Sequence, residues 1–374
     1  MAGKFPAACG VPQFNWSLTP IVSYARAFNL QPGIALSATQ MAQLTSDIVW
    51  LVEQSVTLPD GTTTRALVPQ VYVANIRPGD IDGAGVLLSA QAININVTGD
   101  VNNSGTIGSN IGANITGSVG NRSIVTINAA NINNLQGRIQ GTQVSLNAAN
   151  DINNTGGTLA AASALNINAG RDINLTSTTT SNKGSGSPFT RTQVDRLAGV
   201  YVVGLGATPG SLNLTAGRDI NAQAASIANT STNGATTLQA ARDINLSTVT
   251  TDFAARTGGG ANYMRMQTSQ DVGTSIATTG DLSLRAGNNI NATAANIQSS
   301  QGATNLIAGN TISLLAGQKT SDMAWGSESK TSGFLSSSTT TRRETGSSTQ
   351  AQVTSVGGNS VAVLAGNNAL LEPR

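Results

Sequence analysis

A short, nearly uncharged phrase recurs from residue 167 onward and limits what the chain can fold into. It reads INAGRDINLT at 167–176, LTAGRDINAQ at 214–223, LQAARDINLS at 238–247 and LRAGNNINAT at 284–293. Apolar and polar residues alternate on both sides of a corner, which is the period-two pattern of strands with one buried face. One unit of about 20 residues cannot bury its own apolar face, whereas stacked copies can. The repeat therefore predicts a solenoid of β-strands.

The spacing of the corners predicts regular coils and three insertions. Asp151 and Asp172, like Asp219 and Asp243, lie about 21 to 24 residues apart, as expected for one coil. Longer spacings indicate a coil with an insertion, and each insertion reads as a long two-stranded hairpin arm that leaves the stack at one corner. Since the arms recur about every second coil, we expect neighbouring arms to pack side by side as a second sheet. The predicted insertions lie near 178–210, 250–280 and 317–359.

The first 83 residues have a different character. Ser37 is placed as the N-cap of a short helix. The stretch 47–73 reads as a β-hairpin because two apolar, β-branched runs flank the turn residues PDG at 59–61. We therefore expect residues 1–83 to form a small mixed junction that caps the first coil. Residues 84–374 are expected to form a right-handed parallel β-helix, which makes the fold class all-β.

Composition excludes several functional classes. Charged residues make up 10% of the chain and the formal net charge is +2, which does not predict nucleic-acid binding. The chain contains no His and one Cys, so Ser–His or Cys–His catalysis and multi-Cys metal sites are excluded. No apolar run reaches the ~18–20 residues of a transmembrane helix. Residues 1–10 do not resemble a signal peptide, so the chain is expected to be either cytosolic or an internal part of a longer secreted protein, and the second is favoured.

The repeated corner carries the best-organised charges. Asp172, Asp219 and Asp243 occupy equivalent positions, each directly after an Arg. These acids are interpreted either as a catalytic column or as stacked Arg–Asp pairs at a solvated corner, and the second interpretation is favoured because such pairs are common. Gly170 at the same corner is expected to tolerate a positive φ. We predict no enzyme activity, no cofactor and no metal.

Two stretches resemble a known family. The repeats AGRDINLT, AGNNINAT and NDINNTGGTL are similar to those of filamentous haemagglutinin and of contact-dependent growth inhibition exoproteins. The junction LSATQMAQLTSDIVWLVEQSVTLPDG at 36–61, followed by ALVPQVYV at 66–73, resembles the segment before their second haemagglutinin-repeat region. Together these signals cover about residues 33–374.

The resemblance implies a location and partners. Such proteins are secreted through an outer-membrane barrel of the producing cell by two-partner secretion, and they remain at the bacterial surface. Their second repeat region acts at the outer membrane of a target cell, whose lipids or proteins would be partners. The same polypeptide carries a C-terminal toxin domain, which lies outside this chain.

Two functions stay open at this stage. One is a segment that helps a toxin cross the target-cell outer membrane; the other is an adhesin stalk or binding module for a receptor or glycan. Aromatic side chains favour the lipid headgroup zone, but isolated hairpins also need packing partners, so the aromatic residues of the insertions fit either membrane contact or arm-to-arm packing. The candidate membrane- or partner-contacting residues are Tyr201, Phe253, Tyr263, Met264, Trp325 and Phe334.

Overall fold

The computed structural model describes residues 48–57, 63–72, 87–108, 123–182, 189–206 and 208–372. The chain divides into two compact units, Met1–Asp82 and Gly83–Arg374. In the first unit, β1 (Ile48–Thr57) pairs antiparallel with β2 (Thr63–Tyr72), and Thr57 lies opposite Thr63. The predicted helix after Ser37 and the predicted PDG turn lie outside the described residues.

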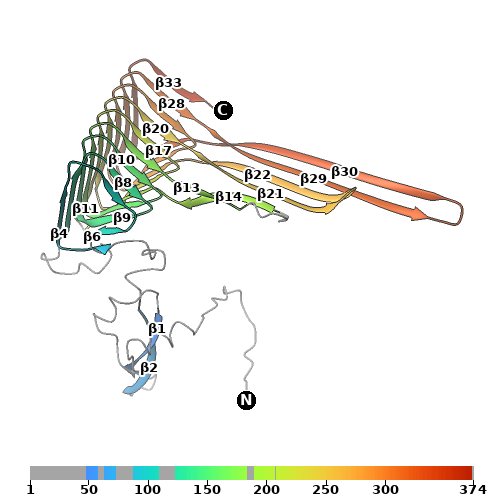
Figure 1. Ribbon diagram of the computed structural model, residues 1–374, viewed down its shortest axis with the longest axis horizontal. Coiled ribbons are helices and arrows are strands. Elements are labelled where there is room, and N and C mark those ends of the chain that lie inside the picture. The colour runs from blue at the N-terminus through green and yellow to red at the C-terminus, as the bar shows by residue number, and fades with distance from the viewer. Residues whose placement is uncertain are drawn as a thin grey trace. The chain divides into compact units, whose positions relative to one another are not determined.

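The second unit is a stack of coils whose parallel strands form three ladders, named A, B and C (Figure 1). Ladder A contains β4 (Ala92–Asn96), β7 (Ile124–Ala129), β9 (Arg138–Ala148), β11 (Thr158–Ala169), β16 (Ser211–Ala216), β19 (Ala235–Ala240), β24 (Leu282–Ala286), β27 (Ala303–Ala308) and β32 (Ser360–Ala365). Ladder B contains β5 (Val101–Asn103), β8 (Ile132–Leu135), β10 (Ile152–Thr155), β12 (Ile173–Thr176), β17 (Ile220–Gln223), β20 (Ile244–Ser247), β25 (Ile290–Thr293), β28 (Thr311–Leu315) and β33 (Asn368–Glu372).

Ladder C completes each coil. It contains β3 (Leu87–Leu88), β6 (Thr106–Gly108), the first halves of β9 and β11, β15 (Gly199–Val202), β18 (Ser226–Asn229), β23 (Ser275–Thr278), β26 (Asn296–Ser299) and β31 (Ser355–Gly357). Because β9 and β11 belong to both ladders, A and C are joined in one 16-stranded sheet, while B is a 9-stranded sheet. The described residues contain no helix, so the predicted all-β stack of parallel strands is confirmed.

The alternation seen in the sequence places one column of side chains inside the stack. In β12, Ile173 and Leu175 are fully buried, whereas Asn174 and Thr176, which alternate with them, are partly exposed. Parallel pairing sets Ile173 between Ile152 and Ile220, so equivalent apolar residues lie one above another. The core is therefore a continuous column of Ile, Leu, Val and Ala, and each coil buries it against only its two neighbours.

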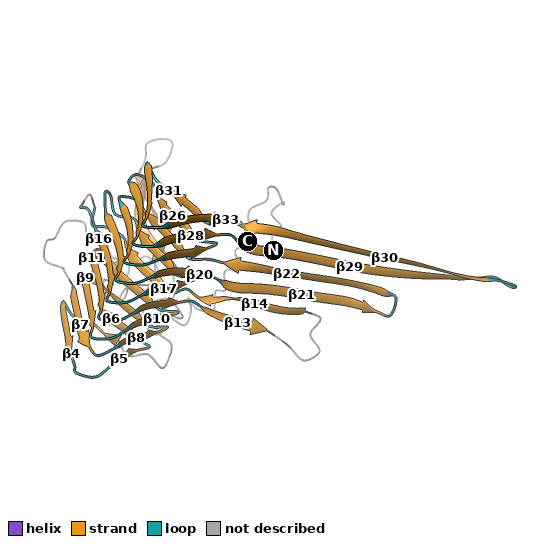
Figure 2. Ribbon diagram, turned by 90° about the horizontal axis from the view of Figure 1, so that it is seen from above, coloured by secondary structure: helices purple, strands orange, loops and turns teal. Residues whose placement is uncertain are grey.

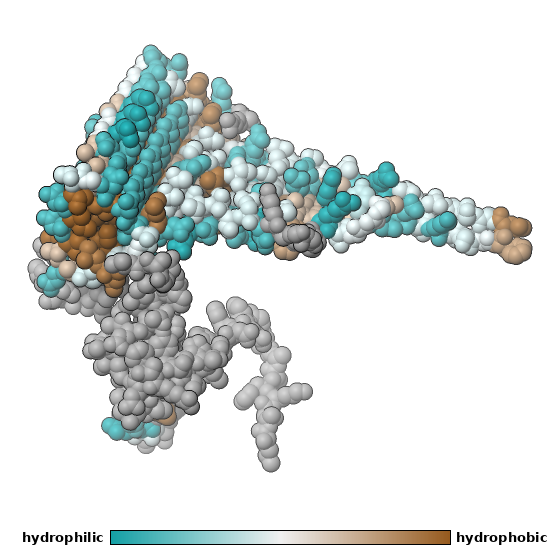
Figure 3. All heavy atoms as spheres, in the orientation of Figure 1, coloured by the Kyte–Doolittle hydropathy of each residue, from teal (hydrophilic) through white to brown (hydrophobic). Residues whose placement is uncertain are grey.

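Asparagine ladders connect the coils on the outer face of ladder B. The amide of Asn174 donates to Asn153 at 2.8 Å, and Asn221 and Asn245 each donate to the Asn of the preceding coil at 2.9 Å. Figure 3 shows hydrophilic stripes running along the stack. Stacked identical amides satisfy one another in this way, as they do in cross-β structures.

The corner between ladders A and B favours glycine for a different reason than the sequence suggests. Gly170 is not among the described residues with a positive φ. Instead, a Cβ at Gly170 would lie 2.1 Å from the carbonyl oxygen of Ala149, and one at Gly217 would lie 2.1 Å from that of Gly170. The expectation of a positive φ at Gly170 is therefore wrong. Successive coils approach closely where the chain turns, which favours glycine there, although Ala241 occupies the equivalent position in another coil.

Three hairpins leave the stack after ladder B and return to ladder C. They consist of β13 (Thr178–Asn182) with β14 (Phe189–Arg196), β21 (Val249–Gly259) with β22 (Asn262–Val272), and β29 (Gly317–Ser332) with β30 (Ser337–Gln352). Coils resume at Gly199, Ser275 and Ser355, so these hairpins end before the predicted limits of 210, 280 and 359. The difference is largest for the first, because residues 199–202 form β15 and pair in ladder C.

The hairpins form one antiparallel sheet, the arm sheet, in the order β13-β14-β21-β22-β29-β30 (Figure 2). One two-stranded hairpin leaves the stack for every two coils. Each ladder of the stack and the arm sheet therefore gain two strands over the same length. Both kinds of strand have the same spacing of about 4.8 Å. Successive hairpins are therefore brought edge to edge, and their strands lengthen from 5 residues in β13 to 16 in β29 and β30.

Candidate functional site

A column of charged side chains follows the corner between ladders A and B. Arg218 donates through Nε to the carboxylate of Asp172 in the preceding coil at 2.8 Å, with a second guanidinium contact to the same carboxylate. The backbone N–H of Asp219 also donates to Asp172, at 3.2 Å. Arg242 makes the same contacts with Asp219. Each carboxylate thus accepts hydrogen bonds from the side chain and the backbone of the next coil.

The carboxylates of this column are more buried than the sequence suggests. Asp172 and Asp219 are only 6% and 4% exposed, whereas the side chains of Arg218 and Arg242 stay about half exposed. A fully solvated corner is therefore wrong for these two acids, because the Arg of the next coil lies over each of them. One coil pair earlier, the hydrogen bond from Arg171 lowers the pKa of the Asp151 carboxyl and raises the pKa of Arg171. The geometry makes the column a link between coils.

The arm sheet has two chemically different faces. Cross-strand partners in a sheet point to the same side. Met266 lies opposite both Ala255 and Met323, and Met264 lies opposite Trp325. This side is named the apolar arm face, and its apolar members are Phe189, Phe253, Ala255, Met264, Met266, Met323 and Trp325. The other side carries more charge, including Arg256, Arg265, Asp322 and Arg343.

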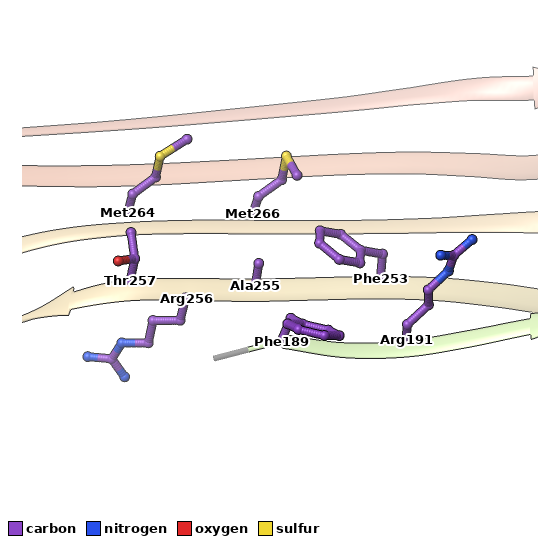
Figure 4. Close-up of a pocket in the computed structure, with 8 residues that line it drawn as sticks. All are labelled: Phe189, Arg191, Phe253, Ala255, Arg256, Thr257, Met264 and Met266. Carbon is purple, nitrogen blue, oxygen red and sulfur yellow. The ribbon is translucent and has the colours of Figure 1, made fainter. Parts of the chain in front are cut away.

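A shallow groove lies on the apolar arm face. The rings of Phe189 and Phe253 stack with centroids 6.5 Å apart and an interplanar angle of 25°. The groove has a volume of about 420 Å³, and Figure 4 shows its lining side chains, among which Arg256 points away from the others. Its lining residues are Phe189, Arg191, Phe253, Ala255, Arg256, Thr257, Met264 and Met266. This surface is suited to an apolar partner with little demand for hydrogen bonds.

Three of the predicted contact residues share the apolar arm face. Phe253 and Met264 line the groove, and Met264 is 47% exposed. Trp325 lies beside Met264, and its indole N–H donates to Glu344 on β30 at 3.1 Å. Their grouping depends on strand register, because the three residues come from β21, β22 and β29.

The other predicted residues lie elsewhere. Tyr263 lies on the opposite face, where its ring covers Gly326 so closely that a Cβ there would be 2.6 Å from the ring. Tyr201 lies on β15 in ladder C and covers Gly199, so its expected place on an arm is wrong. Phe334 occupies the turn between β29 and β30 and is fully exposed.

Sequence reasoning missed part of the apolar surface. Phe189 and Met323 belong to the apolar arm face, and Leu335 is 92% exposed beside Phe334. Period two would have found Met323, since it stands two residues before Trp325 in the same strand. No period-two pattern in the sequence places Phe189 on the apolar arm face. Its side of the sheet is set by pairing with Ala255, which belongs to a different hairpin.

Comparisons with known proteins give one partial match. No family model matches the chain, and no solved structure matches it. Over 165 residues, 44% of this chain, the sequence is 35% identical to Toxin CdiA of Yersinia pestis. The chain is similar in part to a CdiA toxin. The matched region is 5% of that protein's length. The match supports the resemblance to contact-dependent inhibition exoproteins, without distinguishing one repeat region from another.

The described part of the chain lacks two common functional features. None of its residues lies in a helix long and apolar enough to cross a membrane. Within the same ranges, no three metal-binding side chains of His, Cys, Asp or Glu come together. The organised chemical features are therefore the corner column and the apolar arm face.

Proposed function

We propose that this chain is a non-catalytic segment of a secreted bacterial toxin-delivery exoprotein. It would correspond to the second haemagglutinin-repeat region with its preceding junction, and help move a C-terminal toxin across the outer membrane of a neighbouring cell. The partial similarity to Toxin CdiA is the observation that carries the proposal. The junction-like sequence at 36–73, ahead of the repeats, supports the assignment within such a protein.

The architecture supports this proposal. Each coil needs only its neighbours to bury its core, so a chain of this kind can leave the producing cell unfolded through a secretion barrel and fold coil upon coil. In this proposal the winding is right-handed, residues 1–83 cap the first coil, and the protein acts at the bacterial surface. Its partners are the secretion barrel, the toxin domain of the same polypeptide and the target-cell outer membrane. The small net charge of +2 argues against nucleic acid as a partner.

A second candidate function is adhesion. The groove beside the stacked Phe189 and Phe253 rings is an exposed aromatic surface on a long projection, as a module that recognises a receptor or glycan requires. The two functions differ in the step that fails when the repeats are removed. Adhesion requires the repeats for attachment to the target cell, whereas translocation requires them after attachment.

Deleting residues 84–374 from the intact exoprotein tests the proposal. Toxin delivery should be lost, while secretion and attachment to target cells should persist, because translocation follows binding. Attachment is measured by flow cytometry and delivery by target-cell growth. The matched control replaces the deleted residues with armless β-helix coils of equal length. Delivery restored by those coils would show that the segment is a passive stalk, and loss of attachment would favour adhesion.

A further inference from the structure

The third hairpin ends in an exposed apolar tip. β29 and β30 pair from Gly317 opposite Gln352 to Ser332 opposite Ser337, and the N–H of Gly333 closes the turn onto the Ser336 carbonyl at 2.7 Å. Phe334 and Leu335 stand at the centre of this turn, 101% and 92% exposed. Figure 3 shows apolar side chains gathered at the far end of the hairpin.

Charge is arranged behind this tip and not on it. Residues 331–341 contain no charged side chain. Lys330 precedes this stretch, and Arg342 and Arg343 follow it, while Glu328 lies among them opposite Thr341. Glu344 comes next and accepts a hydrogen bond from the indole of Trp325. At about 3.3 Å per residue, Lys330 stands ~13 Å back along its strand from Phe334. The hairpin thus presents an apolar end followed by a mixed charged zone, in which the cations Lys330, Arg342 and Arg343 outnumber the two acids.

We infer that the tip formed by Phe334 and Leu335 is a shallow anchor for a lipid bilayer surface. Apolar side chains of interfacial anchors enter about 5–10 Å below the headgroups, and cations behind them meet anionic lipid phosphates. A stable protein–protein interface buries about 1,200 Å² or more, which two side chains cannot supply. A bilayer requires no matching pocket, so it fits a tip of this size better than a folded partner does.

The same hairpin cannot carry the tip through the hydrocarbon core. Backbone pairing of β29 with β22 ends at Gly326, so from there to the turn both outer edges of the hairpin lack a neighbouring strand among the described residues. Unpaired N–H and C=O groups are too costly in hydrocarbon. The tip therefore stays in the interfacial zone. This inference rests on the proposed function, for which it names the lipid surface as partner of the third hairpin.

Vesicle flotation of the purified 374-residue chain tests the anchor. Vesicles of phosphatidylethanolamine with phosphatidylglycerol should carry the protein. The double variant Phe334→Ser with Leu335→Ser should reduce the partition coefficient about tenfold or more, because both apolar side chains lose their lipid burial. Phe334→Trp should retain binding, since Trp favours the interface. The tip packs against little else, so circular dichroism should be unchanged in all variants.

Val353→Ser provides the matched control, because Val353 is an apolar side chain, 70% exposed, at the base of the same hairpin directly after β30. It should bind vesicles as the parent protein does. Parent-level binding by the double tip variant would overturn the inference, as would loss of binding in Val353→Ser alone. The vesicle result is separate from the deletion experiment. If the chain fails to float with vesicles but the deletion abolishes toxin delivery, only the anchor is refuted. If flotation depends on the tip but delivery survives the deletion, only the proposed function is refuted.

Discussion

Replacing Ile173 with Asp should lower the free energy of unfolding by more than about 4 kcal/mol, the range of an unpaired charge placed in a core. The Ile173 side chain is fully buried and stacks between Ile152 and Ile220 of the adjoining coils. Each coil is stabilised mainly by its neighbours, so the defect should weaken both interfaces at once. Thermal unfolding followed by circular dichroism measures the effect.

Two variants calibrate this expectation. Ile173→Val removes one methylene at the same site and should cost about 0.5–1.5 kcal/mol. Ser338→Asp introduces the same charge on exposed β30 and should stay within about 0.5 kcal/mol of the parent. An unchanged melting temperature in Ile173→Asp would mean that the inward face of ladder B has been assigned to the wrong residues.

The Asp219→Ala variant should lose about 2 kcal/mol of stability. The nearly buried carboxylate accepts hydrogen bonds from Arg242 and from the backbone N–H of Asp243, at 2.8 and 3.2 Å. Alanine leaves that N–H without this acceptor, and an unsatisfied buried donor costs about 1–3 kcal/mol. The exposed half of Arg242 is screened by solvent, so the ion pair itself adds little. Urea unfolding of the purified chain provides the comparison.

In later coils of the same column, asparagines replace the Arg–Asp pair and serve as a natural control. There Asn310 donates to Asn289 at 3.0 Å, and the N–H of Thr311 donates to the same amide oxygen at 3.2 Å. Asp219→Asn combined with Arg242→Asn should copy this arrangement and recover most of the stability lost in Asp219→Ala. A double variant as unstable as the alanine variant would show that the corner depends on charge and not on a hydrogen-bond acceptor.

Local pattern was enough to predict the stack. Period-two alternation around the recurring corner places the Ile of each repeat, including Ile173 and Ile244, on the inward face, and both of these side chains are fully buried. The pattern wrongly assigned Gly199–Val202 to an insertion, because apolar and polar residues alternate in the same way in a solenoid strand and in a hairpin strand. Only pairing with Leu159 and Ile227 assigns Val200 to ladder C. Burial of Asp172 and Asp219 also escaped prediction, since it depends on how Arg side chains of the next coil cover them.

The candidate contact surface was only partly predictable. Enrichment of aromatic residues in the insertions pointed to Phe253 and Trp325, which share the apolar arm face. It also selected Tyr263 and Tyr201, which cover Gly326 and Gly199 respectively. Composition cannot separate these roles, because the face on which a strand residue lies depends on the register between hairpins.

We propose that the coils form a self-sufficient stack and that the arm sheet makes the contacts needed for delivery. Shortening β13–β14, β21–β22 and β29–β30 to Gly-containing turns in the intact exoprotein tests both points. The core column lies outside these hairpins, so the trimmed repeat unit should keep its strand signal in circular dichroism and its cooperative melt. The trimmed exoprotein should be secreted and should attach to target cells, yet deliver no toxin. Delivery at the parent level by a folded, trimmed protein would contradict the claim.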